Sequence, residues 1–128
     1  MGIAGTGVDI VEIARIAEAI DRFGGRLLHR LFTAEEIRYC SSTASPAQHF
    51  AARFALKEAV LKALGTGLSG GIQWREIEVV RNQAGMPGIK LSGAAAERAS
   101  AIGVNCWHIS VSHAHEYAVA QAIGEREN

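Results

Sequence analysis

The stretch FALKEAVLKALGTG, residues 54–67, has the pattern of a helix that ends in a glycine turn. Apolar residues surround Glu58, and Lys62 follows it one helical turn later. A helix this rich in Phe, Leu, Ala and Val is expected to pack in a protein core, where charged side chains are costly unless they are paired. The charges in its C-terminal half therefore need either a partner or a function.

The boundaries of this helix can be predicted from the residues around it. Residues 45–48, SPAQ, have the spacing of a capping box and place Pro46 at the first helical position. Gly65 follows the last apolar residue and is typical of a helix C-terminus. We therefore expect a long helix over residues 46–64.

Strand and helix patterns alternate along the rest of the chain. Alternating apolar residues predict strands at residues 3–11, 74–81, 88–91, 107–112 and 117–123. Helical spacing, together with a capping box at residues 33–36, predicts further helices at residues 12–24, from residue 34 onward, and at 92–103. This order predicts an α+β fold with a mostly antiparallel sheet packed against the long helix. We expect residues 1–128 to form a single domain.

Composition excludes several classes of protein. With 13 basic and 13 acidic residues the formal net charge is zero, whereas a general nucleic-acid-binding protein usually has a basic excess. The two cysteines, Cys40 and Cys106, are isolated in the sequence and expected to be reduced. The N-terminus lacks the basic region of a signal peptide, and no apolar run is long enough to span a membrane. We expect a cytoplasmic protein with neither a nucleic acid nor a membrane as partner.

Two carboxylates lie in segments that are otherwise apolar: Asp9 near the end of the first predicted strand, and Glu58 within the long helix. Mg²⁺ is often held by one or two carboxylates, with waters and substrate phosphates completing its coordination, so this pair is a candidate magnesium site. An alternative is also consistent with the spacing. Glu58 and Lys62 would then be an ordinary solvated i,i+4 pair, and Asp9 would cap the helix that follows it.

Glycines flank both segments. Gly65, Thr66 and Gly67 offer backbone N–H groups and a hydroxyl to a phosphate, with Lys62 and Arg53 as sources of positive charge. As a helix C-terminus disfavours anions, however, Gly65 is also explained as a plain helix stop. In the first strand, residues 5–7 (GTG) indicate a bulge or a close approach of another backbone segment.

The strand at residues 107–112 carries Ser110, Ser112 and His108 on its polar face and ends at His113. A serine–histidine nucleophile lacks the GxSxG motif here, and a zinc site at His113 and His115 lacks an evident third ligand. These residues could also form an anion site built from hydroxyls and an imidazole. The simplest interpretation is that they mark a solvent-facing strand end.

Arginines recur on the helix predicted at residues 12–24. Arg15, Arg22 and Arg26 are spaced close to two and three helical turns apart, which predicts one basic face, although residues 24–25 (GG) interrupt the helix before Arg26. Such a face is either solvated or a docking surface for an acidic partner.

Four blocks of this sequence together resemble one family. They are GTGVDIVEIARI (5–16), FTAEEIRYC (32–40), FAARFALKEAVLKALGTG (50–67) and ISVSHAHEYAVA (109–120). The chain resembles the holo-acyl-carrier-protein synthases, the small bacterial 4′-phosphopantetheinyl transferases, over nearly its whole length.

The resemblance implies a function and a site. Such enzymes transfer the phosphopantetheine arm of coenzyme A to a serine of apo-acyl carrier protein, release adenosine 3′,5′-bisphosphate, require Mg²⁺ and form homotrimers, and they serve fatty-acid biosynthesis. By this resemblance, Asp9 and Glu58 are the magnesium ligands and Lys62 a catalytic residue beside the transferred phosphoryl group. The residues expected to bind coenzyme A are Arg53, Lys62, Gly65, Thr66, Pro87, Ser112 and His113. Those expected to dock the carrier are Arg15, Arg22 and Arg26.

Two other classes of function share part of this pattern. A different magnesium enzyme that acts on a nucleotide or phosphodiester would use Asp9 and Glu58 but need no carrier protein. A non-catalytic module that binds an acyl carrier protein would use the arginines and would tolerate the loss of Glu58.

Overall fold

The computed structural model describes residues 2–128, and its central element is the helix expected from the sequence. Helix α3 spans Pro46–Leu64, begins with Pro46 in the first turn and ends at Gly65 in the left-handed conformation (φ 82°), so both predicted boundaries are confirmed. The capping box predicted at Ser45 is wrong. Because Ser45 does not adopt the extended backbone of a capping residue (φ −133°, ψ 70°), its side chain makes no capping hydrogen bond.

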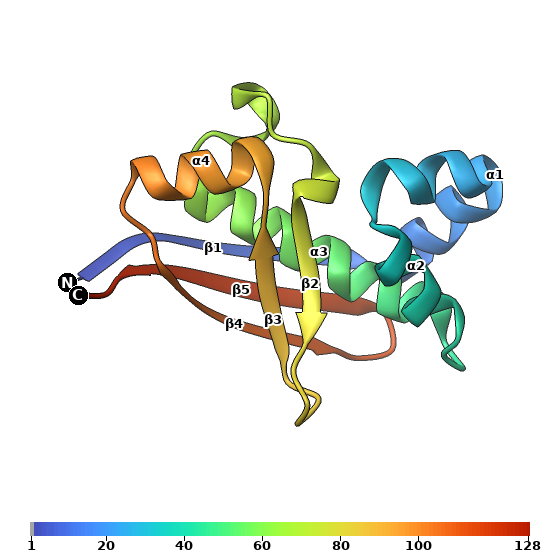
Figure 1. Cartoon of the computed structure of the whole chain (residues 1–128). Coiled ribbons are helices and arrows are strands. Elements are labelled where there is room, and N and C mark those ends of the chain that lie inside the picture. The colour runs from blue at the N-terminus through green and yellow to red at the C-terminus, as the bar shows by residue number, and fades with distance from the viewer. Residues whose placement is uncertain (1) are drawn as a thin grey trace.

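A three-stranded antiparallel sheet packs along α3 (Figure 1). Its order is β1 (Gly2–Glu12), β5 (Tyr117–Arg126) and β4 (Cys106–His113). The inward-facing residues of β4, which are Trp107, Ile109 and Val111, pack against the main core as their alternation predicts. The predicted antiparallel sheet on a long helix is therefore confirmed.

Two glycines allow β1 to lie directly against α3. A Cβ atom added at Gly5 would collide with the carbonyl oxygen of Ala63, and one added at Gly7 with that of Ala59. The pairing of β1 with β5 also shifts register between Ile3 and Gly5. The close backbone approach that the glycines indicated is thus present, and the strand pairing is irregular next to Gly5.

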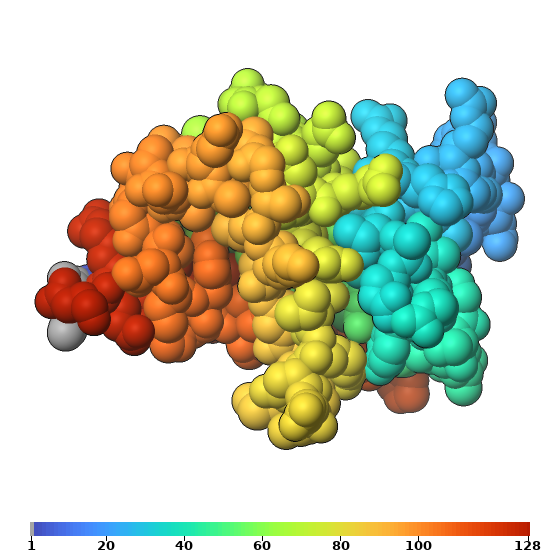
Figure 2. All heavy atoms as spheres, viewed as in Figure 1, coloured from blue at the N-terminus to red at the C-terminus, as the bar shows by residue number. Residues whose placement is uncertain are grey.

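The β2–β3 hairpin forms a second sheet, made of β2 (Ile77–Arg81) and β3 (Pro87–Leu91). Figure 1 shows it crossing in front of α3, and in Figure 2 its tip projects from the body of the molecule. Residues 74–76, predicted as the start of a strand, instead form a 3₁₀ turn, η2 (Trp74–Glu76). The local bond from the Glu76 N–H to the Gln73 carbonyl (3.0 Å) replaces strand pairing there.

Two helices occupy one end of the molecule, to the right in Figure 1. Helix α1 (Ile13–Leu31) is kinked at Gly24, where φ is 60°, so the predicted interruption is confirmed although helical turns resume beyond it. Helix α2 (Ala34–Ser41) begins with the predicted capping box between Thr33 and Glu36. The remaining elements are η1 (Gly67–Gly70) and α4 (Gly93–Ala101).

A buried ion pair joins α2, α3 and the hairpin. Lys57 Nζ lies 2.8 Å from Glu36 Oε1 and also donates to the carbonyl oxygens of Ile77 (2.5 Å) and Trp74 (3.2 Å). The other carboxylate oxygen of Glu36 accepts the Val79 N–H at 2.9 Å. Because both charges are fully hydrogen-bonded, the pair fixes how these three elements meet.

No helix within residues 2–128 combines the length and the apolar character that a membrane crossing requires.

Candidate functional site

Asp9 and Lys62 meet where β1 crosses the C-terminal half of α3. Lys62 Nζ donates to Asp9 Oδ1 and to the Val8 carbonyl oxygen, both at 2.9 Å. The Asp9 side chain is 17 % exposed and that of Lys62 is 51 % exposed. The ion pair of Lys62 is thus made with another element, so the solvated i,i+4 pair with Glu58 considered from the sequence is wrong.

The capping role considered for Asp9 is also wrong. The residue at the N-cap of α1 is Glu12, and no side chain makes a capping bond there. Asp9 instead points from the inner face of β1 towards α3, in register with Ala120 of the neighbouring strand. Its carboxylate is held there by the Lys62 ammonium.

Glu58 lies on α3 one turn before Lys62 and faces the same open hollow. We call this the carboxylate hollow; it has a volume of about 510 Å³ and is lined by Asp9, Ile10, Val11, Glu12, Arg15, Ile16, Phe54, Glu58, Lys62 and Tyr117. Partial burial raises the pKa of Glu58, and the negative charge of Asp9 adds to the rise while Lys62 opposes it. A cation bound beside Glu58 would therefore favour the ionised form of its carboxylate.

The donor set of this hollow fits a hard divalent cation. Asp9 and Glu58 supply carboxylate oxygens from two elements that the glycines of β1 hold in contact. Mg²⁺ prefers such oxygen ligands and leaves positions for water and phosphate, which an open hollow can admit. The ammonium already seated on Asp9 indicates that this carboxylate attracts positive charge.

A second hollow adjoins the first beyond the end of α3. We call it the loop hollow; it has a volume of about 480 Å³ and is lined by Glu58, Leu61, Lys62, Gly65, Gly67, Leu68 and Trp74. Glu58 and Lys62 line both hollows, so these two residues stand at the boundary between them. The Thr66 hydroxyl lies nearby, at 3.4 Å from the Gly67 carbonyl oxygen.

Arg53 lies in a separate pocket, between the N-terminal half of α3 and the hairpin. We call this the arginine pocket; its lining is His49, Ala52, Arg53, Leu56, Val79, Arg81, Pro87, Val111 and His113. Arg53 is 6 % exposed, and its Nε finds no hydrogen-bond partner within residues 2–128. A buried guanidinium with an unpaired donor favours an anionic ligand.

The arginine pocket is more strongly positive than the sequence suggested. The guanidinium groups of Arg53 and Arg81 lie 4.5 and 5.0 Å from the centre of the Tyr39 ring. Partial burial lowers the pKa of His49, and the neighbouring charge of Arg53 lowers it further. Sequence reasoning gave no role to Tyr39, although it lies in the block at residues 32–40, and it missed Arg81, which lies in the hairpin far along the chain from α3.

The two candidate residues at the end of β4, Ser112 and His113, lie in different surroundings. Ser112 lies on the outer face of the sheet, opposite Val119, whereas His113 lines the arginine pocket. His113 Nδ1 lies 2.7 Å from Gln48 Nε2, an amide rather than a serine, which disfavours a serine–histidine nucleophile. His113 and His115 belong to no group of three metal-binding donors in the described part of the chain.

The predicted arginine stripe is divided between two places. Arg15 lines the carboxylate hollow, while Arg22 and Arg26 line a different hollow together with Phe23, Leu27 and Arg30. Arg15 and Arg22 lie seven residues apart, about 10 Å along the helix, so they reach different hollows, whereas Arg22 and Arg26 share one on either side of the kink at Gly24. The structure therefore places Arg22 and Arg26 on one basic surface of α1 and Arg15 separately at the carboxylate hollow.

Comparison with known proteins gives one consistent family. Residues 5–122 match the model of the 4′-phosphopantetheinyl transferase superfamily. The holo-[acyl-carrier-protein] synthase of Koribacter versatilis is 52 % identical over 123 residues, which is 96 % of this chain and 98 % of that protein.

Solved structures agree with the sequence relatives. The holo-[acyl-carrier-protein] synthase of Neisseria meningitidis superposes with a TM-score of 0.88 at 31 % identity, covering 96 % of this chain and 98 % of that one. The Helicobacter pylori enzyme of the same name, solved in complex with coenzyme A, gives a TM-score of 0.82 at 31 % identity and covers 94 % of this chain and 99 % of that one.

Proposed function

Because this chain belongs to the 4′-phosphopantetheinyl transferase superfamily, we propose that it transfers the 4′-phosphopantetheine arm of coenzyme A to a serine hydroxyl of an apo-acyl carrier protein. The products are holo-acyl carrier protein and adenosine 3′,5′-bisphosphate. The observation that carries the proposal is the convergence of Asp9, Glu58 and Lys62 at one open hollow of a chain whose relatives are holo-[acyl-carrier-protein] synthases. A pure carrier-binding module would have no use for that constellation.

Asp9, Glu58 and Lys62 have different roles in the proposed phosphoryl transfer. Asp9 and Glu58 would hold Mg²⁺, which would supply positive charge to the phosphoryl-transfer site when bound. Lys62 moves its ammonium from Asp9 to the phosphoryl oxygens, where it stabilises the charge that develops on the transferred and leaving groups. Catalysis then rests on positioning and electrostatics, as in phosphoryl transfer generally.

Coenzyme A would contact the chain at two distinct places. The loop hollow, lined by Gly65 and Lys62 with Thr66 next along the chain, accepts the pyrophosphate and the start of the pantetheine arm. The arginine pocket accepts a further phosphate against Arg53 and His113, with Pro87 beside the adenine. The unpaired donor of Arg53 supports this placement.

These two places point to a site shared between copies of the chain. Arg53 and Lys62 are nine residues apart on α3, about two and a half turns, so they project from opposite faces of one helix. One coenzyme A molecule reaches both types of residue more directly if they come from neighbouring subunits. We therefore propose the homotrimer implied by the family resemblance, with each site completed by a second copy.

The outer face of the three-stranded sheet supports the assembly. Val8 and Ile10 are 59 % and 61 % exposed there, and Val119 of β5 lies between Ile10 and Ser112. An exposed apolar sheet face of this kind favours burial against another subunit. Sedimentation analysis tests the assembly, and a fully active monomer would refute the shared site.

The carrier would dock on the basic surface of α1. Arg22 and Arg26 line one hollow with the exposed Phe23, which is the combination of charge and apolar area that suits an acidic helix. Arg15 at the rim of the carboxylate hollow would guide the carrier serine towards the phosphorus. We place this reaction in fatty-acid biosynthesis and in the cytoplasm, where the free cysteines Cys40 and Cys106 would stay reduced.

Mass spectrometry of an apo-acyl carrier protein tests the proposal directly. Incubation with this protein, coenzyme A and Mg²⁺ should add one phosphopantetheine, on the order of 340 Da, and EDTA should abolish the gain because the phosphoryl site needs its metal. No mass gain with several carriers and a folded protein would overturn the transferase assignment. Hydrolysis of coenzyme A without a carrier would instead indicate a different magnesium enzyme.

A further inference from the structure

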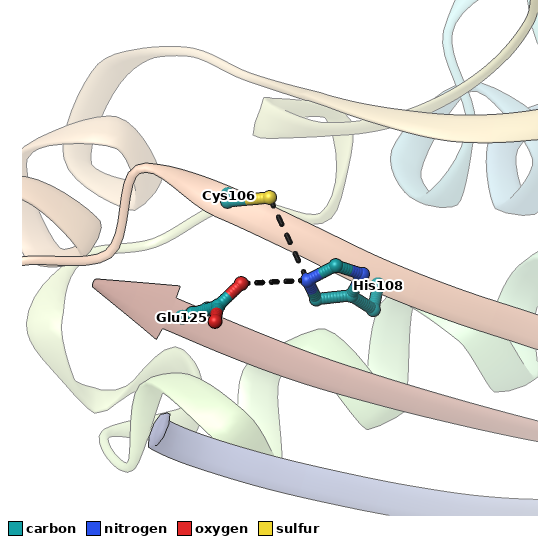
Figure 3. A group of neighbouring side chains, drawn as sticks. All are labelled: Cys106, His108 and Glu125. Atoms are coloured by element: carbon teal, nitrogen blue, oxygen red, sulfur yellow. Dashed lines mark hydrogen bonds and ion pairs between the residues drawn. The ribbon is translucent and has the colours of Figure 1, made fainter. Parts of the chain in front are cut away.

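Three side chains of different donor chemistry converge on the outer face of the sheet, at the end opposite to α1. Cys106 and His108 come from β4, and Glu125 comes from β5, as Figure 3 shows. Cys106 is paired directly with Glu125 in the sheet register, and His108 lies two residues further along the same strand. Since side chains alternate across a strand, all three must project from the same face.

The distances among the donor atoms are those of a metal-binding group. Cys106 Sγ lies 3.6 Å from His108 Nε2, and His108 Nε2 lies 2.8 Å from Glu125 Oε1. One donor atom from each residue lies within 4.8 Å of the other two. With Zn–S of about 2.3 Å and Zn–N of about 2.0 Å, a tetrahedral site has a sulfur–nitrogen separation of about 3.5 Å. Glu125 Oε1 would move a few tenths of an ångström away from His108 Nε2, because two ligand atoms of a tetrahedral zinc site lie further apart than two hydrogen-bonded atoms.

We propose that Cys106, His108 and Glu125 form a binding site for a divalent transition metal, best matched by Zn²⁺. The donor set of one sulfur, one nitrogen and one oxygen suits a borderline-soft ion rather than Mg²⁺, which prefers oxygen ligands alone. The site is separate from the carboxylate hollow, because Asp9 lies on the inner face of β1. This inference therefore stands whether or not the chain transfers phosphopantetheine.

The chain after β5 adds to the negative charge at this place. Asn105 Nδ2 donates to the Glu127 carbonyl oxygen at 2.6 Å, and the Glu127 N–H donates to Asn105 Oδ1 at 2.7 Å, which holds the C-terminal residues against the start of β4. Desolvation raises the pKa of the Cys106 thiol, and the carboxylates of Glu127 and Glu125 raise it further. A bound cation would instead lower the pKa of the thiol and favour the thiolate. Glu127 or a water can supply the fourth ligand.

The simplest explanation of this cluster is a surface ion pair between His108 and Glu125. It accounts for the 2.8 Å contact but gives no role to the thiol that lies beside the same imidazole nitrogen. The other cysteine does not compete for metal, because Cys40 is completely buried and burial raises its pKa to about 11. A metal held by β4 and β5 would clamp the end of the sheet and stabilise the folded chain by ligand linkage.

Cobalt substitution tests the site with the metal ion alone. Co²⁺ added to the reduced protein, with excess Mg²⁺ to fill oxygen-only sites, should give a thiolate-to-cobalt charge-transfer band and the intense visible bands of tetrahedral Co²⁺. Zn²⁺ should displace these bands and should raise the midpoint of thermal unfolding. The variant C106S should lose the charge-transfer band, and H108Q should weaken binding of both metals. H115Q is the matched control, because His115 is an exposed histidine outside the group, and it should bind as the wild type does.

Three results would overturn the proposal. They are a folded wild-type protein without the charge-transfer band, a C106S protein that retains it, and equal losses in H108Q and H115Q. All three substituted positions lie at least partly at the surface, so circular dichroism should show intact folds.

Discussion

Gly7 of β1 lies directly against the carbonyl of Ala59 in α3, with no room between them for a Cβ atom. Gly5 makes the same approach to Ala63, one helical turn further along. Two residues of strand and four residues of helix cover nearly the same length, about 6–7 Å, so the two contacts match in spacing. This pair of contacts holds Asp9 close enough to α3 to meet Lys62.

The substitution Gly7→Ala should therefore damage both stability and activity. The added methyl group must push β1 away from the backbone of α3, and overpacking of this kind typically costs about 1–3 kcal/mol. Because Asp9 lies two residues further along β1, phosphopantetheine transfer should fall more than the loss of folded protein explains. Denaturant unfolding and initial rates measured on the folded fraction check the two effects.

Gly88→Ala is the matched control for that experiment. Gly88 is also a strand glycine, but a Cβ atom there would lie 3.6 Å from Val80 Cγ2, an ordinary contact. Its unfolding free energy should stay close to that of the wild type. Equal destabilisation of both variants would show that the approach of β1 to α3 is not specially tight.

Glu58→Gln should stabilise the protein while it abolishes transfer. Burial first, and then Asp9, raise the pKa of Glu58, so the folded chain holds this proton more tightly than the unfolded chain does. Ionised Glu58 therefore costs stability, and the cost grows as pH rises from the ordinary glutamate pKa of about 4.3 to the raised folded value. Gln cannot ionise and avoids this cost.

Thermal unfolding in EDTA over a pH series measures the effect. The E58Q variant should unfold at a higher temperature than the wild type at neutral pH, and the gap should close below about pH 4. Mg²⁺ should then raise the unfolding midpoint of the wild type and not that of E58Q. A gap that is independent of pH would contradict the raised pKa, and equal Mg²⁺ effects would remove Glu58 from the metal site.

The sequence predicted those parts of the fold that depend on neighbouring residues. Pro46 and Gly65 set the ends of α3, and the capping box at Thr33 sets the start of α2, because each acts within one turn of its own position. Ser45 shows the limit of this reasoning, since its sequence spacing was correct but its backbone conformation was not.

The parts that depend on long-range contacts could not be predicted in this way. Arg81 meets Tyr39 only because the hairpin packs against α2, and Glu125 meets Cys106 only through the register of β5 with β4. Neither the packing of elements against each other nor the register of paired strands can be predicted from the spacing of neighbouring residues. The grouping of Asp9 with Glu58 was suggested by their unusual place in apolar segments and by family resemblance, and it is the packing of β1 on α3 that brings them to one hollow.

Lys57→Met should be strongly destabilising even though Lys57 lines none of the hollows described above. The change removes the buried ammonium and leaves the Glu36 carboxylate, which is 2 % exposed, without its cation. Breaking a buried ion pair from one side typically costs about 3–5 kcal/mol. Chemical denaturation measures this loss, and Lys90→Met at an exposed position of β3 is the control. A loss no larger than that of the control would show that the pair does not organise the core.

Arg53→Met should weaken binding of coenzyme A through one phosphate. Losing a hydrogen-bonded charge pair costs about 1.5–3 kcal/mol, which is about a 10- to 150-fold rise in the Michaelis constant for coenzyme A. The wild type should prefer coenzyme A over 3′-dephospho-coenzyme A, and R53M should lose that preference. An unchanged preference would place the 3′-phosphate outside the arginine pocket.

Charge reversal on α1 should separate binding of the carrier from binding of coenzyme A. Arg22 and Arg26 line one basic surface beside Phe23, so R22E and R26E should repel an acidic carrier helix. The Michaelis constant for the carrier should rise about tenfold or more, most steeply at low salt, while that for coenzyme A should change little. The exposed Lys90, on β3 rather than α1, provides the control variant K90E, which should leave both constants unchanged. Equal rises for both substrates in R22E and R26E would place the carrier elsewhere on the molecule, because a docking surface that never touches coenzyme A cannot change its affinity.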